Sequence, residues 1–328
     1  MDALDPDFKS RLHDILSLCD QTGIYVILDN HGDMVGSQGC GNGVPTWVQI
    51  KAAPHLIGMP LVTDFPYNRI PSITVENVPG FSYCGMNASK WLNYAGNPNY
   101  NLMNECCQQM NSGGNPGGLG YTTISQATMN YIISPGEGRD SFVRFWSLVA
   151  QEVMLHPSAF AAELMNEPMT IKRQDMYDTW RAVAIAINTV IPDMSVSICD
   201  VGEGAVMPSW ITDIVGAGFA LNNATVDWIR NSTTLFYSWH WYGAPATPEE
   251  AVKNVMAIQN DWNVPSFLTE FGDCAAWPVA RAANISHSYW HYSSYCNTGA
   301  SFGNRTVPED TFGACILGWA DGNSSNCT

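Results

Sequence analysis

Amphipathic segments alternate along the chain with short, wholly apolar ones. Residues 5 to 20 place Phe8, Leu12, Ile15, Leu16 and Cys19 at helical spacing. The Asp and Pro at the start of this segment are residues that favour a helix N-terminus. The apolar run IYVIL follows at residues 24 to 28, as expected of a strand buried on both faces. A helix followed by such a strand is the repeating unit of a parallel α/β sheet.

The same unit recurs through the second half of the chain. Further helices are predicted at residues 139 to 155, 173 to 191, 248 to 260 and 275 to 295, the third opening with a capping box of Thr247 and Glu250. Further strands are predicted at residues 159 to 166, 194 to 200, 234 to 242, 265 to 270 and 313 to 319. Six strands that alternate with helices predict an α/β fold with a parallel sheet.

Residues 32 to 138 interrupt this pattern. The segment is rich in Gly, Asn, Pro, Met and Cys, lacks a clear period, and is far too long for an ordinary connection between a strand and a helix. Its aromatic residues and cysteines favour an ordered cap stapled by disulfides. We therefore divide the chain into a first barrel part at 1-31, a cap-like insertion at 32-138 and a second barrel part at 139-328.

Composition narrows the class of protein. The formal charge of -16 disfavours nucleic acid or an acidic membrane as a partner. Ten cysteines without paired CxxC motifs favour disulfides over zinc. The cysteines and the frequent glycosylation sequons both indicate an oxidising space outside the cytoplasm, so we expect a secreted glycoprotein. We expect its signal peptide to be missing from this chain, because the N-terminus has no apolar segment. No run is long enough for a transmembrane helix. Glycosylation sequons begin at Asn87, Asn223, Asn231, Asn284, Asn304, Asn323 and Asn326.

Polar residues gather where the predicted strands end. In parallel α/β folds the carboxyl ends of the strands carry the active site. Glu167 in LMNEP and Glu270 in FLTEFG each follow an apolar strand. A single strand-end Glu is more often a solvated residue, whereas two carboxyl groups facing one cleft are what glycoside hydrolysis requires. The other polar or aromatic strand ends are Asp29, Asn30, His31, Asn166, Asp200, His240, Tyr242 and Trp319.

The ordered strand ends LDNH, AELMNEP, His240-x-Tyr242, LTEFG and Trp319 resemble glycoside hydrolase family 5, the cellulase-like retaining enzymes. The resemblance implies an α/β fold of the (β/α)8 TIM-barrel type in which strands 3 to 8 are present. It also implies that the first two strands are absent, together with the Arg that family members carry at the end of strand two. A partial reading frame is the expected reason.

The same resemblance implies roles for four residues. Glu167 would be the general acid/base, and Glu270 the nucleophile that forms a glycosyl-enzyme. Asn166 would hold the sugar 2-hydroxyl, and Tyr242 would orient Glu270.

Three further residues would line the cleft. His31 and His240 would donate or accept hydrogen bonds, and Trp319 would be a flat platform under the sugar. Trp319 could instead fill the core. His31 could instead bind a metal with Asp29 and Asp33, but no third partner stands at metal spacing, so we expect neither a metal nor another cofactor.

The expected function is hydrolysis of β-glucan oligo- or polysaccharides by a monomeric retaining endo-β-glycosidase. Three alternatives stay open. The segment NGVPTW, which ends at Trp47, is similar to a region of endoglycoceramidase-like members, which favours a glycolipid substrate. The missing strands favour a catalytically inactive carbohydrate-binding fragment. The Asp and His strand ends leave room for a metal-dependent hydrolase of the same barrel class.

Overall fold

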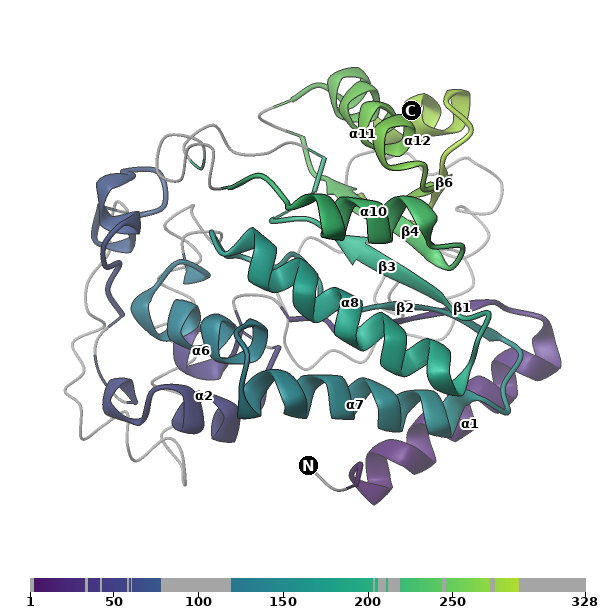
Figure 1. Ribbon diagram of the computed structural model, residues 1–328, viewed down its shortest axis with the longest axis horizontal. Helices are drawn as coiled ribbons and strands as arrows, with labels where there is room; N and C mark the ends of the chain where they lie inside the picture. Colours follow the sequence, from purple (N-terminus) through teal and green to yellow (C-terminus); the bar gives the residue numbers. More distant parts are fainter. Residues whose placement is uncertain are drawn as a thin grey trace, which may run out of the picture. The chain divides into compact units, whose positions relative to one another are not determined.

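The computed structural model describes residues 3–32, 35–41, 43–57, 59, 61–77, 119–202, 204–205, 211, 219–243, 246–271 and 275–288. The chain forms two compact units, Met1–Gly202 with Met207–Phe236 and Glu203–Val206 with Tyr237–Thr328. Within the described residues, strands β1 to β6 follow one another in chain order, with helices between them (Figure 1). This topology confirms the predicted α/β fold as an incomplete (β/α) barrel. The division at residues 31 and 138 stays a prediction.

The first unit opens with the predicted helix and strand. Helix α1 (Pro6–Thr22) begins at Asp5, whose carboxylate accepts hydrogen bonds from the backbone N–H groups of Asp7 and Phe8. It ends at Gly23, which has a left-handed φ of 70° that a glycine adopts without strain. Strand β1 (Val26–Asp29) pairs with β2 (Ala159–Glu163), which in turn pairs with β3 (Ser195–Cys199). Both pairings are parallel, so the carboxyl ends of the three strands share one edge.

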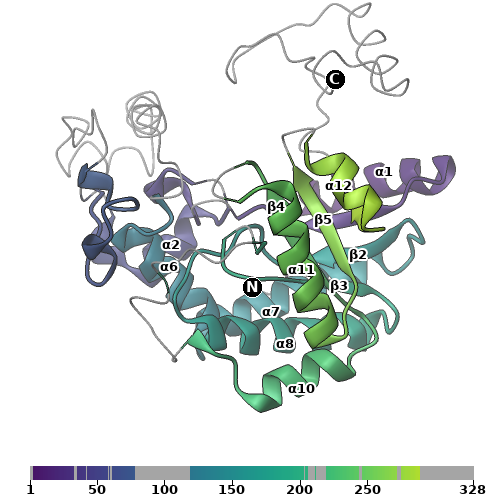
Figure 2. The ribbon, with the colours of Figure 1, turned by 90° about the horizontal axis from the view of Figure 1, so that it is seen from above.

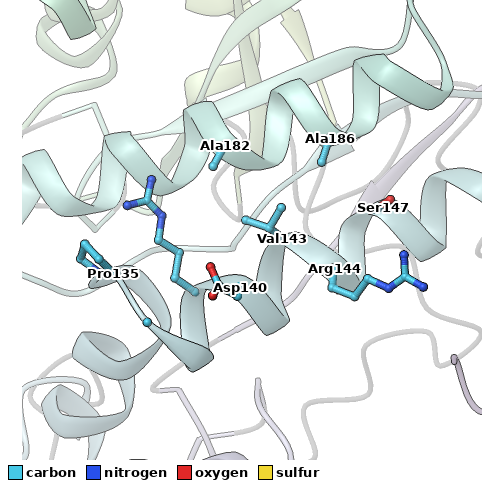
Figure 3. A pocket seen from close by; sticks show the side chains of 9 residues that line it. Pro135, Asp140, Val143, Arg144, Ser147, Ala182 and Ala186 are labelled. Carbon is cyan, nitrogen blue, oxygen red and sulfur yellow. The ribbon is translucent and has the colours of Figure 1, made fainter. Parts of the chain in front are cut away.

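Helices α7 (Glu137–Val153) and α8 (Arg173–Val190) lie side by side within the first unit (Figure 1). Trp146 and Trp180 are buried, and the Trp180 indole N–H donates to the Cys199 carbonyl at 3.1 Å. This bond ties α8 to the end of β3. A groove between the outer faces of the two helices, lined by Arg139, Val143, Ala182 and neighbouring residues, contains no candidate site residue (Figure 3).

The described part of the insertion is ordered. It contains helices α2 (Thr46–Ala52) and α6 (Thr123–Ile133) and the short turns η1 (Ser37–Gly39), η2 (Pro54–Leu56), η3 (Tyr67–Arg69) and η4 (Val75–Asn77). Ala53, Val75, Leu119 and Ile124 form a small core of its own. Disulfides across the insertion stay a prediction, because Cys84, Cys106 and Cys107 lie outside the described residues.

Helix α10 (Asn223–Asn231) also belongs to the first unit and is not predicted by the apolar pattern. Its N-cap, Asn222, accepts a hydrogen bond from the Thr225 N–H. The helix is short, so local capping defines it more than periodicity does. Elsewhere in the described chain, Cys19 is a free thiol, and the Cys199 thiol donates to the Asp200 carbonyl at 3.4 Å. None of the described helices combines the length and the apolar character needed to cross a membrane.

The second unit holds most of β4 (Leu235–Trp241) and all of α11 (Pro248–Trp262), β5 (Ser266–Phe271), α12 (Ala276–Ala282) and β6 (Ser286–His287). Strands β4, β5 and β6 pair in parallel, and α11 runs beside β5 (Figure 2). The predicted capping box is confirmed, because Thr247 and Glu250 each bond the backbone N–H of the other.

The predicted helix at residues 275 to 295 is wrong in its extent. Helix α12 ends at Ala282, Asn284 has a left-handed φ of 57°, and the Ile285 N–H returns to the Ala280 carbonyl. The chain then enters β6, which pairs with β5. The alanines that precede this turn, Ala280, Ala282 and Ala283, conceal it from an analysis of apolar spacing. The predicted strand at 313 to 319, with Trp319, lies outside the described residues.

Candidate active site

Pairing between β1 and β2 continues past the ends of both strands. The Asn30 N–H donates to the Glu163 carbonyl at 3.1 Å, and the Asn166 N–H donates to the Asn30 carbonyl at 3.0 Å. The Asn30 side chain donates to the Leu164 carbonyl at 3.3 Å. These bonds place His31, which follows Asn30, beside the segment that carries Asn166.

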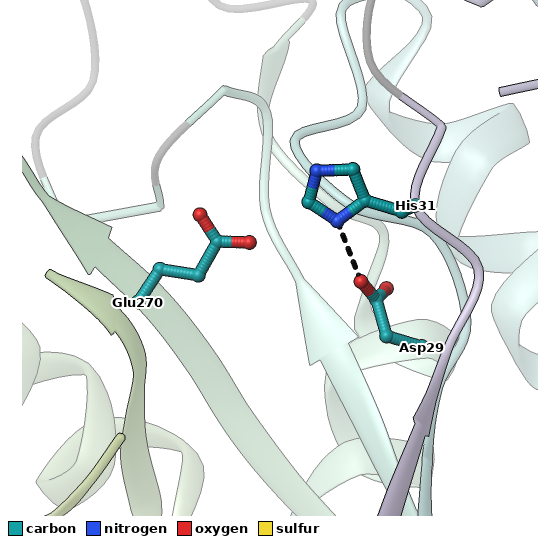
Figure 4. A group of neighbouring side chains, drawn as sticks. All are labelled: Asp29, His31 and Glu270. Atoms are coloured by element: carbon teal, nitrogen blue, oxygen red, sulfur yellow. Dashed lines mark hydrogen bonds and ion pairs between the residues drawn. The ribbon is translucent and has the colours of Figure 1, made fainter. Parts of the chain in front are cut away.

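His31 is oriented from both of its ring nitrogens. Its Nδ1 lies 2.7 Å from the Asp29 carboxylate (Figure 4), and its Nε2 lies 3.5 Å from the Asn166 amide nitrogen. An ionised carboxylate can only accept, so Nδ1 carries the hydrogen toward Asp29 and Nε2 is an acceptor toward the amide. The first unit therefore brings together three of the polar strand-end residues, as the sequence predicts.

Glu167 directly follows the buried Asn166 and has an unusual backbone. Its φ is 38°, in the left-handed region that residues other than glycine seldom occupy. Such a conformation costs on the order of 1–3 kcal/mol and persists only where the surroundings hold it. The next residue is held in this way, because the Pro168 carbonyl accepts the Gly202 N–H at 3.0 Å.

Asp200, at the end of β3, is paired with a cation. The Arg173 Nε donates to its two carboxylate oxygens at 2.9 and 3.2 Å, and the Arg173 Nη2 donates to one of them. The Val201 N–H donates to the same carboxylate at 2.8 Å. Asp200 therefore fastens the start of α8 to the end of β3.

The second unit builds its site around Glu270. The pairing of β4 and β5 sets His240 opposite Glu270, next to a bulge in the register. The Tyr242 hydroxyl donates to Glu270 Oε2 at 2.5 Å. Nδ1 of the buried His240 lies 3.6 Å from the same oxygen, and its Nε2 lies 3.1 Å from the Thr269 hydroxyl. One oxygen of a largely buried carboxylate is thus held by a tyrosine and faced by a histidine.

This arrangement suits a carboxylate that must attack at a fixed position, because its orientation is set before substrate arrives.

Within either unit by itself, the described residues bring no three His, Cys, Asp or Glu ligands within metal-binding distance. Of the residues named from the sequence, Asp33 and Trp319 lie outside the described chain. No pattern in the sequence indicated Arg173 or the insertion residues that contact the segment after Glu167.

Comparisons with known proteins identify the fold. No known family model matches the chain, and no curated protein matches it. Among solved structures it is similar to endo-glycoceramidase II from Rhodococcus sp. in complex with a five-membered iminocyclitol, with a TM-score of 0.54, 16% identity, and coverage of 88% of this chain and 61% of that chain. For the lactosyl-enzyme intermediate of the same enzyme, the TM-score is 0.52 at 18% identity, covering 88% and 60%.

The chain thus spans about three-fifths of the length of these solved chains. At this identity the likeness concerns the fold. It agrees with the parallel strands in chain order and with the predicted absence of part of a barrel. The chain has the (β/α)-barrel fold of endo-glycoceramidase II, in incomplete form.

Proposed function

We propose that the protein is a retaining β-glycosidase in which Glu167 is the general acid/base and Glu270 the nucleophile. The observation that carries the proposal is the setting of Glu270, a largely buried carboxylate at a strand end with the Tyr242 hydroxyl at 2.5 Å and the ring of His240 beside it. The left-handed backbone of Glu167, just beyond the carboxyl end of β2, supports the choice of Glu167 as the general acid/base.

The reaction takes place in two displacements. In the first, a Glu270 oxygen attacks the anomeric carbon, the bond to the leaving oxygen breaks, and Glu167 gives its proton to that oxygen. In the second, Glu167 takes a proton from water, the water oxygen attacks the anomeric carbon, and the bond to Glu270 breaks. The second proton transfer restores Glu167, so acid and base work is done by one residue.

Polar neighbours in the first unit would bind the sugar. Asn166 and His31 offer an amide and an imidazole side by side, suited to adjacent hydroxyl groups of a pyranose. Trp319 is proposed as the platform under the ring, because an aromatic face packs against the apolar face of a sugar.

The proposed substrate is a β-linked glucan. A glycolipid with a β-linked sugar is the second candidate, favoured by the structural likeness to endo-glycoceramidase II. The two differ in the group that leaves, a second sugar or a lipid alcohol. Release of reducing sugar from soluble β-glucan oligosaccharides, set against release from a glycosylceramide in detergent, separates them.

We also propose that the protein is secreted. Asn223, Asn231 and Asn284, the sequon positions within the described chain, are all exposed. Attachment of glycans there requires no unfolding. A decrease in mass after enzymatic deglycosylation of the protein from a secreting eukaryotic host tests this proposal.

The central test is covalent labelling. A 2-deoxy-2-fluoro glycoside with a good leaving group should label Glu270, identified by peptide mass, and Glu270→Gln should abolish both labelling and turnover. In an inhibitor complex the two carboxyl groups should lie about 5 Å apart, whereas about 6.5–9.5 Å would indicate inversion. Sugar binding without labelling or turnover would favour the inactive binding fragment, and loss of turnover with a chelator would favour a metal-dependent hydrolase.

A further inference from the structure

The insertion holds the segment that carries the proposed acid/base. Gln126, a buried residue of α6, donates from its Nε2 to the Met169 carbonyl at 2.7 Å and to the Gly120 carbonyl at 2.8 Å. Met169 is two residues beyond Glu167. One side-chain amide therefore joins the insertion to the segment that follows the strand end.

The Gln126 side chain is itself fixed. The Tyr67 hydroxyl donates to Gln126 Oε1 at 2.5 Å. Burial raises the pKa of Tyr67 well above its ordinary value, so the hydroxyl keeps its proton and stays a donor. Because Oε1 accepts from Tyr67, the amide nitrogen must face the two carbonyls.

Apolar packing supports these hydrogen bonds. Met169 and Ile171 pack against the buried cluster of Tyr67, Ile73 and Tyr121. The fit is close at Gly120, where an added Cβ would lie 2.0 Å from the Met169 sulfur. The insertion therefore matches the shape of this segment as well as its polar groups.

The segment is thus held from two elements. The Gly202 N–H binds the Pro168 carbonyl, and Gln126 binds the next carbonyl, that of Met169. The residue just before this pair is Glu167, whose φ of 38° requires support from its surroundings. Loss of either anchor would allow the segment to relax toward a less strained backbone and would move the Glu167 carboxyl.

We infer that Gln126 is a positioning residue for Glu167, so that the insertion is part of the acid/base machinery. This inference rests on the proposed function. Its consequence is specific for the first displacement, which kcat/KM reports. In that step the position of the Glu167 carboxyl matters for a leaving group that needs a proton and not for one that leaves without it.

The test compares Gln126→Met with Gln174→Met. Gln174 also has a partly buried amide, and its side-chain hydrogen bonds go to Asp178, Thr225 and the Asn222 N–H, all outside residues 164–172. We expect Gln126→Met to lower kcat/KM for a phenyl β-glycoside by about 10-fold or more, because general acid catalysis contributes about 10²–10⁴-fold. The 2,4-dinitrophenyl glycoside, whose leaving group needs no proton, should change by less than about twofold. In the control variant Gln174→Met, the ratio of kcat/KM for the phenyl glycoside to kcat/KM for the 2,4-dinitrophenyl glycoside should equal that of the wild type.

Hydrogen exchange gives a readout independent of turnover. Peptides covering residues 164–172 should exchange faster in Gln126→Met and at the wild-type rate in Gln174→Met. An unchanged substrate ratio or unchanged exchange in Gln126→Met overturns the inference. If the wild type is inactive, or if Glu167→Ala slows both substrates alike, the proposed function fails instead, and exchange alone then decides whether Gln126 holds the segment.

Discussion

The pair of Arg173 and Asp200 makes a quantitative prediction about stability. The Asp200 side chain is only 2% exposed and accepts from Nε and Nη2 of Arg173 and from the Val201 N–H. Truncation by Asp200→Ala would leave a guanidinium, itself 16% exposed, without its counter-charge. Breaking a buried pair from one side costs about 3–5 kcal/mol. We expect the lower end, about 3 kcal/mol, because Arg173 keeps the Phe219 carbonyl and partial access to water.

Urea unfolding followed by circular dichroism measures this loss as a lower midpoint at constant slope. The double variant Arg173→Met with Asp200→Leu removes both charges and should recover at least about 1 kcal/mol of the loss, since a buried pair is often replaced by apolar residues at little cost. The recovery shows how much of the loss comes from leaving the guanidinium without its counter-charge. A loss below about 1 kcal/mol in Asp200→Ala, or a double variant no more stable than the single one, would refute the reasoning.

Three further predictions follow from individual contacts. Tyr242→Phe should slow labelling of Glu270 by a fluoro-glycoside about 10- to 100-fold, since a hydrogen bond to a charged group contributes about 1.5–3 kcal/mol; an unchanged inactivation rate would count against it. The hydrogen bond from Ser158 lowers the pKa of Asp20 in the folded protein. The ionised Asp20 therefore stabilises the fold above the pKa that Asp20 has in the unfolded chain, and this stabilisation is lost as the pH falls through its pKa in the folded protein. Below about pH 4, the unfolding free energy of Asp20→Asn should therefore decrease less steeply with falling pH than that of the wild type. An equally steep decrease in both proteins would contradict the prediction. Trp180→Phe should cost about 1–3 kcal/mol from a lost hydrogen bond and a small cavity, measured by thermal unfolding, and an unchanged Tm would show that the buried indole is dispensable.

Local signals predicted much of the fold. Asp5 and Gly23 bound α1 because a carboxylate cap and a left-handed glycine act within one helical turn. The capping box of Thr247 and Glu250 is equally local. The strand ends follow from apolar runs that stop at polar residues, which is why the sequence alone predicts that His31 and Asn166 lie near each other.

Long-range contacts within irregular chain were not predictable. Gln126 and Met169 meet across 43 positions, and the insertion that carries Gln126 has no period to indicate which face is buried. The bond between Tyr242 and Glu270 spans 28 positions but was expected, because the resemblance to a known family supplied a partner that the residues alone do not. Sequence reasoning thus succeeded where a regular repeat or a known motif set the register.

The contact of Gln126, Gly120 and Tyr67 with Met169 has a consequence for protein engineering. Exchange of surface loops between relatives is a common way to change substrate range, and it treats an insertion as a replaceable part. Here the insertion packs closely against the segment after Glu167, and the Gln126 amide of the insertion donates to the Met169 carbonyl of that segment. A transplanted insertion would need residues 168–171 transferred with it, so the smallest unit that can be exchanged comprises both pieces of chain.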